Sequence, residues 1–354
     1  MSSIKTDTQS NLHSNRQLNT LPFDPQPTPG ARNAICVCLR VEPNEKVTVI
    51  TDEVSLEIAA ALVHELELVG CRYHPWVLED VAMRPLKDLP QVIADDLATS
   101  QVSIFAVQVQ ANELKSRMTM TGIVNRYKIR HAHMVNINKQ IMLEGMRADF
   151  LKVDRLSAKV VERVRAAKKI RATTPSGTDL TADLNPNYRW IKTSGIISTE
   201  KWGNLPGGEI FTTPGEVNGT FVIDGVVGDY LCAKFGDLKS NPLTVEIRKN
   251  RLIEAHSANK ELKDDFWAYT HTDENSNRVG EFAIGTNIEL NDVIGQILQD
   301  EKYPGVHIAF GNPYGAHTGA NWDSTTHIDV VGRKFNIWVD DQQIMKDGKF
   351  LVEA

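Results

Sequence analysis

The chain has 354 residues, of which 41% are hydrophobic and 24% are charged, values close to those of ordinary globular proteins. A net charge of -6 at pH 7 gives no sign of the basic surface typical of nucleic-acid-binding proteins, so we expect no nucleic-acid partner. The length is sufficient for two domains, each with its own hydrophobic core.

The N-terminal segment, residues 1–30, is polar and rich in Ser, Asn, Gln and Pro, which predicts a flexible arm. It lacks the apolar centre of a signal peptide, and no later stretch approaches 18 consecutive apolar residues. The four cysteines (Cys36, Cys38, Cys71 and Cys232) show no second pair at metal-binding spacing, and we expect reduced thiols. These features predict a cytoplasmic protein with no membrane partner.

From residue 46 onward, strand-like segments rich in β-branched residues alternate with amphipathic helical segments. Such alternation predicts an α/β domain with a mostly parallel sheet, which we place at residues 31–175. The predicted strands are 46–52, 101–109 and 132–138, and the clearest predicted helices are 53–70 and 157–170.

The pattern changes after residue 171, where short apolar strands are separated by Gly, Asn and Pro. Residues 170–184 alternate around a Pro-Ser-Gly turn and predict a hairpin. Residues 291–302 give the clearest helical pattern in this half. We therefore expect residues 176–354 to form a β-rich (α+β) domain with mainly antiparallel strands.

Polar residues interrupt several apolar strands of the second half, at Glu209, Glu281, His307, His327 and Asp329. Taken singly, a strand glutamate is usually exposed and a strand histidine is more often a hydrogen-bonded core residue. His327 and Asp329 are more specific, because residues two apart in a strand point to the same face. Burying both groups is costly unless they share a cation or a complete set of hydrogen bonds.

Together these residues offer two imidazoles and three carboxylates, a suitable ligand set for two divalent cations such as Zn, Co, Mn or Mg. Two such ions share a bridging carboxylate and activate a water molecule. His307, His327 and Asp329 alone would instead form the triad of a mononuclear Fe(II) oxygenase. Glu209 and Glu281 favour the two-metal interpretation, because the iron triad leaves them without a role.

Two further residues are candidates for catalysis. Tyr314 lies seven residues after His307 and could bind metal or stabilise an oxyanion. Glu216, in a Pro-Gly turn, is a candidate for the general base, although a turn residue without catalytic function explains it as well.

Four segments, "NLPGGEIFTTP", "VGEFAIGTN", "VHIAFGNPYG" and "THIDVV", occur in this order and resemble the C-terminal half of the thermophilic aminopeptidase family. This family comprises aminopeptidase T and S, which are cobalt-activated metallopeptidases. The resemblance covers roughly residues 170–332. It implies a two-domain fold, a dimer with enclosed active sites, and a two-metal centre that removes N-terminal residues from peptides.

Matching the family motifs residue by residue implies metal ligands at Glu209, Glu281, His307, His327 and Asp329, with the family tyrosine at Tyr314. Gly208 departs from the family, whose peptidases commonly carry a second glutamate there. Related ring-cleaving dioxygenases carry a histidine at the position of Glu281 and an apolar residue at that of Glu209, so this sequence sides with the hydrolases.

The sequence therefore predicts a metal-dependent hydrolase that cleaves a peptide or small amide with a metal-activated water, as a homodimer or larger homo-oligomer. The alternative is a mononuclear Fe(II) ring-cleaving dioxygenase acting on a dihydroxylated (hetero)aromatic compound. A third possibility is a binding protein that kept the fold without the activity, and it predicts no bound metal.

Overall fold

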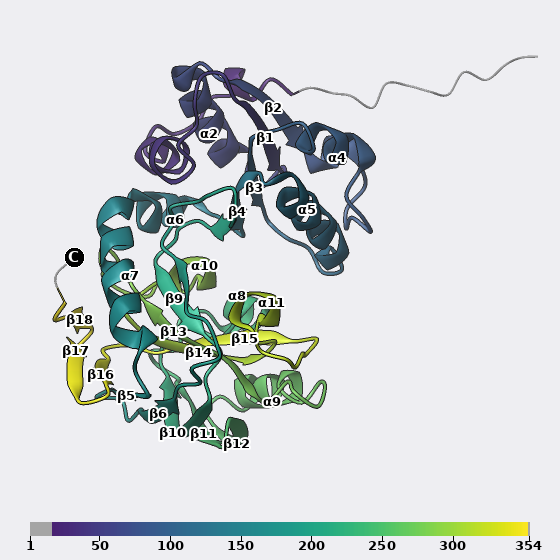
Figure 1. Cartoon of the computed structure of the whole chain (residues 1–354). Helices are drawn as coiled ribbons and strands as arrows, with labels where there is room; N and C mark the ends of the chain where they lie inside the picture. Colours follow the sequence, from purple (N-terminus) through teal and green to yellow (C-terminus); the bar gives the residue numbers. More distant parts are fainter. Residues whose placement is uncertain (1–15, 353–354) are drawn as a thin grey trace, which may run out of the picture. The chain divides into compact units, whose positions relative to one another are not determined.

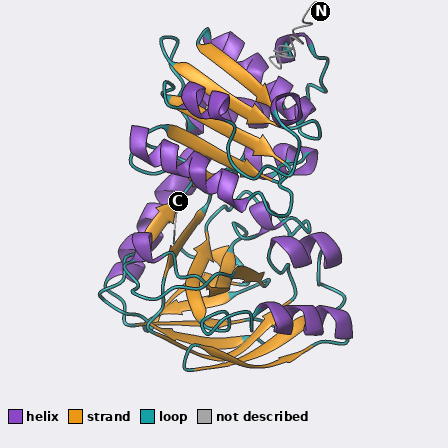
Figure 2. Ribbon diagram, turned by 90° about the vertical axis from the view of Figure 1, so that its right-hand side faces the viewer, coloured by secondary structure: helices purple, strands orange, loops and turns teal. Residues whose placement is uncertain are grey.

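The computed structural model describes residues 16–352, which form two compact units (Figure 1). The first unit ends at Met146 and also contains the returning segment Ile197–Leu205. The second unit consists of Arg147–Ile196 and the chain from Pro206 onward. Strands dominate the second unit, whereas helices flank the strands of the first (Figure 2).

The first unit is an α/β domain around a five-stranded parallel sheet with the order β2-β1-β3-β4-β8. Its central strands are almost wholly buried, as is expected when helices cover both faces of a parallel sheet. The strands are β1 (Lys46–Thr51), β2 (Arg72–Val77), β3 (Val102–Val107), β4 (Arg130–Val135) and β8 (Gly203–Asn204). The helices are η1 (Leu18–Thr20), α1 (Thr28–Arg32), η2 (Asn33–Cys38), α2 (Leu56–Val69), α3 (Leu78–Val81), α4 (Gln91–Leu97), α5 (Leu114–Tyr127), α6 (Lys139–Leu143) and η3 (Gly145–Arg147).

The second unit contains two antiparallel sheets, in agreement with the predicted β-rich domain. The eight-stranded sheet comprises β12 (Arg251–His256), β11 (Leu243–Arg248), β10 (Glu216–Ile223), β6 (Asp179–Asp183), β5 (Lys169–Thr173), β16 (Asn336–Val339), β17 (Gln342–Lys346) and β18 (Lys349–Phe350), in that order. The five-stranded sheet comprises β15 (His327–Val331), β14 (Gly305–Gly311), β13 (Val279–Gly285), β9 (Glu209–Thr212) and β7 (Ile191–Thr193). The helices are α7 (Phe150–Arg165), α8 (Asp229–Phe235), α9 (Lys260–Tyr269), α10 (Ile297–Asp300) and α11 (Gly315–Thr318).

One hydrophobic core joins the two sheets and helix α7. Phe221 of β10 and Phe335 lie in this core with ring centroids 5.8 Å apart. The five-stranded sheet contributes alternate residues, such as Phe282 of β13 and Ile308 of β14. Its other face is left for the polar residues of the same strands, because side chains alternate along a strand.

The boundary between the units differs from the predicted division at residues 175 and 176. Helix α7 packs against β7 and β9, and its buried residues Leu156, Val160 and Val164 belong to the core of the second unit. The chain also returns to the first unit, where β8 pairs with β4. A helix pattern indicates which residues are buried but not which sheet they are buried against, so the sequence did not reveal this division.

The predicted flexible arm is wrong for its second half, while residues 1–15 lie outside the described part of the chain. Leu18 is 1% exposed and packs with Ala59 and Val63 of α2, so this segment is anchored by apolar burial. Cys36 and Cys38 lie in the π-helix η2, and all four cysteines are free thiols.

The helix predicted at 291–302 is reduced to the single turn of α10. Gly295 has a positive φ of 78°, and the carboxylate of Asp300 accepts hydrogen bonds from the backbone N–H groups of Ile294 and Gln296. These bonds stabilise a turn where the helical pattern predicted continuous helix. Between residues 16 and 352, no helix is long and apolar enough to cross a membrane.

Candidate metal site

The five predicted ligands lie on one face of the five-stranded sheet, opposite the hydrophobic core. Strand pairing places Glu281 opposite Ala309 and places Ala309 opposite Asp329, while His307 faces Ala283. These alanines are small, so the polar side chains can converge above them. The core residues that alternate with the ligands are Ile210, Phe282, Ile308, Ile328 and Val330.

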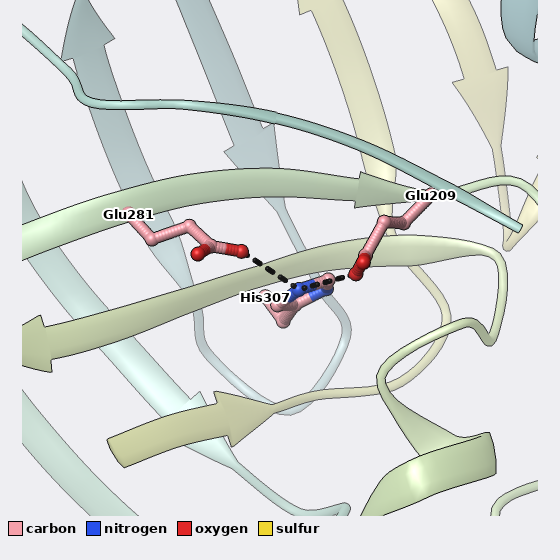
Figure 3. A group of neighbouring side chains, drawn as sticks. All are labelled: Glu209, Glu281 and His307. Carbon is pink, nitrogen blue, oxygen red and sulfur yellow. Dashed lines mark ion pairs between the residues drawn. The ribbon is translucent and has the colours of Figure 1, made fainter. Parts of the chain in front are cut away.

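Glu209, Glu281 and His307 form the first group of potential ligands (Figure 3). His307 Nε2 lies 3.3 Å from Glu209 Oε2 and 3.6 Å from Glu281 Oε1. One ligand atom from each residue lies within 4.8 Å of the others. All three side chains are almost fully buried.

Glu281, His327 and Asp329 form the second group. His327 Nε2 lies 3.8 Å from Glu281 Oε2 and 3.5 Å from Asp329 Oδ1. His327 Nδ1 donates a hydrogen bond to the backbone carbonyl of Asn312 at 2.9 Å. This bond holds the ring so that Nε2 faces the carboxylates, which is the usual way in which a protein orients a metal-binding histidine.

The nitrogen and oxygen atoms of both groups suit a divalent cation. His307 Nε2 is buried and has no hydrogen-bond partner within residues 16–352, although two carboxylates face it. A buried polar atom left without a partner carries a penalty that a bound ion would remove. Imidazole nitrogens and carboxylate oxygens are the donors that Zn, Co and Mn use in proteins.

The pKa values of the site residues reflect the carboxylates gathered there. Burial alone would lower the pKa of His307, but Glu209 and Glu281 outweigh it and raise this pKa to about 10. In the same way, Asp329 overcomes burial and raises the pKa of His327 to about 9. Burial, with the Asp329 carboxylate, raises the pKa of Glu281. The cluster therefore attracts positive charge, either as protons on the histidines or as metal ions.

Tyr314 lies beside the second group. Its ring centroid is 4.5 Å from that of His327, and the residue adopts a positive φ of 49° at the start of α11. Although 42% of the residue is exposed, desolvation, followed by the charges of Glu281 and Asp329, raises the pKa of Tyr314 well above its ordinary value. Its hydroxyl is therefore a neutral donor at physiological pH.

Glu216, the predicted general base, is placed elsewhere by the structure. It is the first residue of β10 in the eight-stranded sheet, is exposed, and accepts a hydrogen bond from Asn218 at 2.9 Å. It belongs to neither ligand group. The role of Glu216 as general base stays a prediction.

Two charged residues at the site were missed by the sequence analysis, Lys302 and Glu301. The Lys302 side chain is 1% exposed, and its Nζ donates to Glu209 Oε1 at 2.7 Å and also contacts Glu301. Burial, aided by Glu209 and Asp329, raises the pKa of Glu301 to about 8 against the opposing effect of Lys302. The pattern placed both residues at the end of a predicted helix, where charged side chains are normally solvated.

The buried carboxylates and histidines on one face of a β-rich domain suit a metal-dependent enzyme. Residues 148–350, more than half of the chain, match the family described as thermophilic metalloprotease (M29). The chain belongs to this family of metallopeptidases. The family predicted from the four sequence motifs is thereby confirmed.

Two solved structures share the fold over almost the whole chain. Wild-type AmpT from Thermus thermophilus is 15% identical with a TM-score of 0.68, covering 94% of this chain and 100% of that protein. The 2,5-dihydroxypyridine dioxygenase from Pseudomonas putida KT2440 is 15% identical with a TM-score of 0.67, covering 93% of this chain and 98% of that protein. No curated protein matches the chain by sequence. The predicted two-domain architecture is confirmed by the fold.

Proposed function

We propose that the protein is an aminopeptidase-like hydrolase that uses two divalent ions and acts as a homodimer or larger homo-oligomer. The two-ion site is supported by the position of Glu281, which belongs to both ligand groups. One of its oxygens faces His307 and the other faces His327, so the carboxylate belongs to both ligand groups. A shared carboxylate is the characteristic link between two neighbouring metal ions.

Glu209, Glu281 and His307 would hold one ion, and Glu281, His327 and Asp329 the other. When bound, such ions polarise a scissile carbonyl and lower the pKa of water. The negative charge of the site would attract the free α-amine of a peptide. The neutral Tyr314 hydroxyl would donate a hydrogen bond to the oxyanion that develops on the carbonyl oxygen.

The dioxygenase alternative shares the fold and needs His307, His327 and Asp329 around one iron. Among the described residues these three do not form one group, because His307 joins Glu209 and Glu281 whereas His327 joins Glu281 and Asp329. The buried glutamates would have no ligand role in that enzyme. The arrangement therefore supports the hydrolase.

Removing metal from the purified protein with a chelator is expected to abolish hydrolysis of a short peptide with a free N-terminal amine. Adding Co²⁺, Zn²⁺ or Mn²⁺ should restore it, because the ions supply the electrophile. Elemental analysis at saturating metal should give about two ions per chain. The N-acetylated peptide is the matched substrate control and should remain intact.

Oxygen uptake with Fe(II) and 2,5-dihydroxypyridine, together with about one ion per chain, would contradict this proposal. Protein without any bound ion and without activity would favour the binding-protein alternative.

Replacing Tyr314 with phenylalanine should lower kcat about 10²-fold with little change in metal content, because one oxyanion donor is lost while the ligands remain. Steady-state kinetics and elemental analysis would measure the two effects separately. Tyr230→Phe, at a residue that is 63% exposed on α8, is the matched control and should leave both unchanged. Loss of metal in Tyr314→Phe would instead assign the hydroxyl to ion binding.

A further inference from the structure

The buried ammonium group of Lys302 lies beside the first ligand group of the metal site. Lys302 Nζ donates to Glu209 Oε1 at 2.7 Å and also contacts the carboxylate of Glu301. The hydroxyl of Thr193 donates to the same Glu209 oxygen at 2.9 Å. Only Glu209 Oε2 faces His307, at 3.3 Å. The first ligand group therefore shares its outer carboxylate with a permanent positive charge.

The second ligand group has no such neighbour. Asp329 forms an ion pair with His327, and no Lys or Arg pairs with it in residues 16–352. His327 is fixed by a backbone carbonyl, which carries no formal charge. The two groups share Glu281, so the difference between them lies in their outer carboxylates, Glu209 and Asp329.

We propose that the two groups bind their ions unequally, and this proposal rests on the proposed two-ion function. The group of Glu281, His327 and Asp329 binds the tight ion. The group of Glu209, Glu281 and His307 binds a weak, exchangeable ion, because the Lys302 ammonium repels a cation at that position. The repulsion is strong because both charges lie in the protein interior, where water and salt screen little.

Lys302 is thus a residue that tunes the site without reaching the reacting atoms. A purely structural role is the competing explanation, in which the ammonium only holds Glu209 in place. The two explanations predict opposite changes in the affinity of the weak ion when Lys302 is replaced. Removing a repelling charge tightens the weak ion, whereas removing a support for a ligand loosens it.

The test is a Co²⁺ titration of the metal-free protein, followed by visible absorption and by equilibrium dialysis with elemental analysis. The wild-type protein should bind one ion at least about tenfold more tightly than the second, a difference of about 1.4 kcal/mol. The double variant Lys302→Met with Glu301→Gln should tighten the second ion by about tenfold or more and leave the first unchanged. Both substitutions are made together because methionine alone would leave the Glu301 carboxyl group buried without its hydrogen-bond partner.

The matched control is Lys152→Met with Glu289→Gln, which removes a half-exposed Lys–Glu pair of the same kind. This control variant should change the affinity of neither ion. Asp329→Asn assigns the positions and should remove the tight ion. Circular dichroism confirms that each variant is folded before titration.

Two ions of equal affinity in the wild-type protein would overturn the proposal, as would a weaker second ion in the double variant. Loss of the weak ion rather than the tight one in Asp329→Asn would also overturn it. Wild-type protein that binds no Co²⁺ at all would instead defeat the proposed two-ion function itself.

Discussion

Replacing Glu281 with glutamine should reduce peptide hydrolysis by a thousandfold or more and lower the content of bound ions in both groups. The two oxygens of this carboxylate face different histidines, one at 3.6 Å and the other at 3.8 Å. Among the described residues, Glu281 is the one that belongs to both ligand groups. Metal ions contribute several kcal/mol to a hydrolytic transition state, and about 4 kcal/mol corresponds to a thousandfold in rate. Kinetics and elemental analysis on the same preparation would measure both effects.

The matched control is Glu289→Gln, which makes the same chemical change at a partly exposed residue paired with Lys152. We expect normal activity and metal content, since exposed pairs of this kind contribute little. A Glu281→Gln protein that retained two ions and its activity would show that the two-ion site is wrong. Loss of one ion alone would show that Glu281 does not bridge.

The ligand face was predictable from sequence because its signal is local. In "THIDVV" the ligands His327 and Asp329 are two positions apart with Ile328 between them, and in "VHIAF" His307 is flanked by apolar residues; Ile328 and Ile308 enter the core. A strand translates that alternation directly into two faces. The structure brings Glu209, Glu281, His307, His327 and Asp329 together on one of them.

The parts that the sequence did not predict depend on contacts between distant segments. Lys302 is buried because Glu209, 93 positions earlier, and the adjacent Glu301 accept hydrogen bonds from its ammonium group, and no pattern around residue 302 indicates this. The helix predicted at 157–170 overlaps α7 only over residues 157–165, because Lys169 already begins β5. Only the packing of α7 against β7 and β9 shows that it belongs to the second unit. The sequence also did not show that Ile197–Leu205 belongs to the first unit, because only the pairing of its strand β8 with β4 reveals this.

Metal binding is expected to release about two protons per chain at pH 7. In the metal-free protein the carboxylates raise the pKa of His307 to about 10 and that of His327 to about 9, so both imidazoles are protonated at neutral pH. An ion binds only the neutral imidazole. Proton competition should therefore weaken metal affinity at pH 7 by about three orders of magnitude at His307 and about two at His327, relative to high pH.

Calorimetric titrations in buffers with different ionisation enthalpies would count these protons, and the apparent affinity should rise with pH until about pH 9–10. His307→Ala should release about one proton fewer, whereas His256→Ala, at an exposed histidine outside the site, should release the same number as wild type. Binding without proton release at pH 7 would show that the histidines are neutral in the metal-free protein.

The same shifts fix how the stability of the metal-free protein depends on pH. Both histidines have a higher pKa in the folded protein than the ordinary value of 6.5. Their contribution to stability is therefore fully present below pH 6.5 and is lost as the pH rises through about 9 and 10. We expect the melting temperature of chelator-treated protein to fall over this range. Metal-loaded protein should not show this fall, because its imidazoles are already neutral below this pH range.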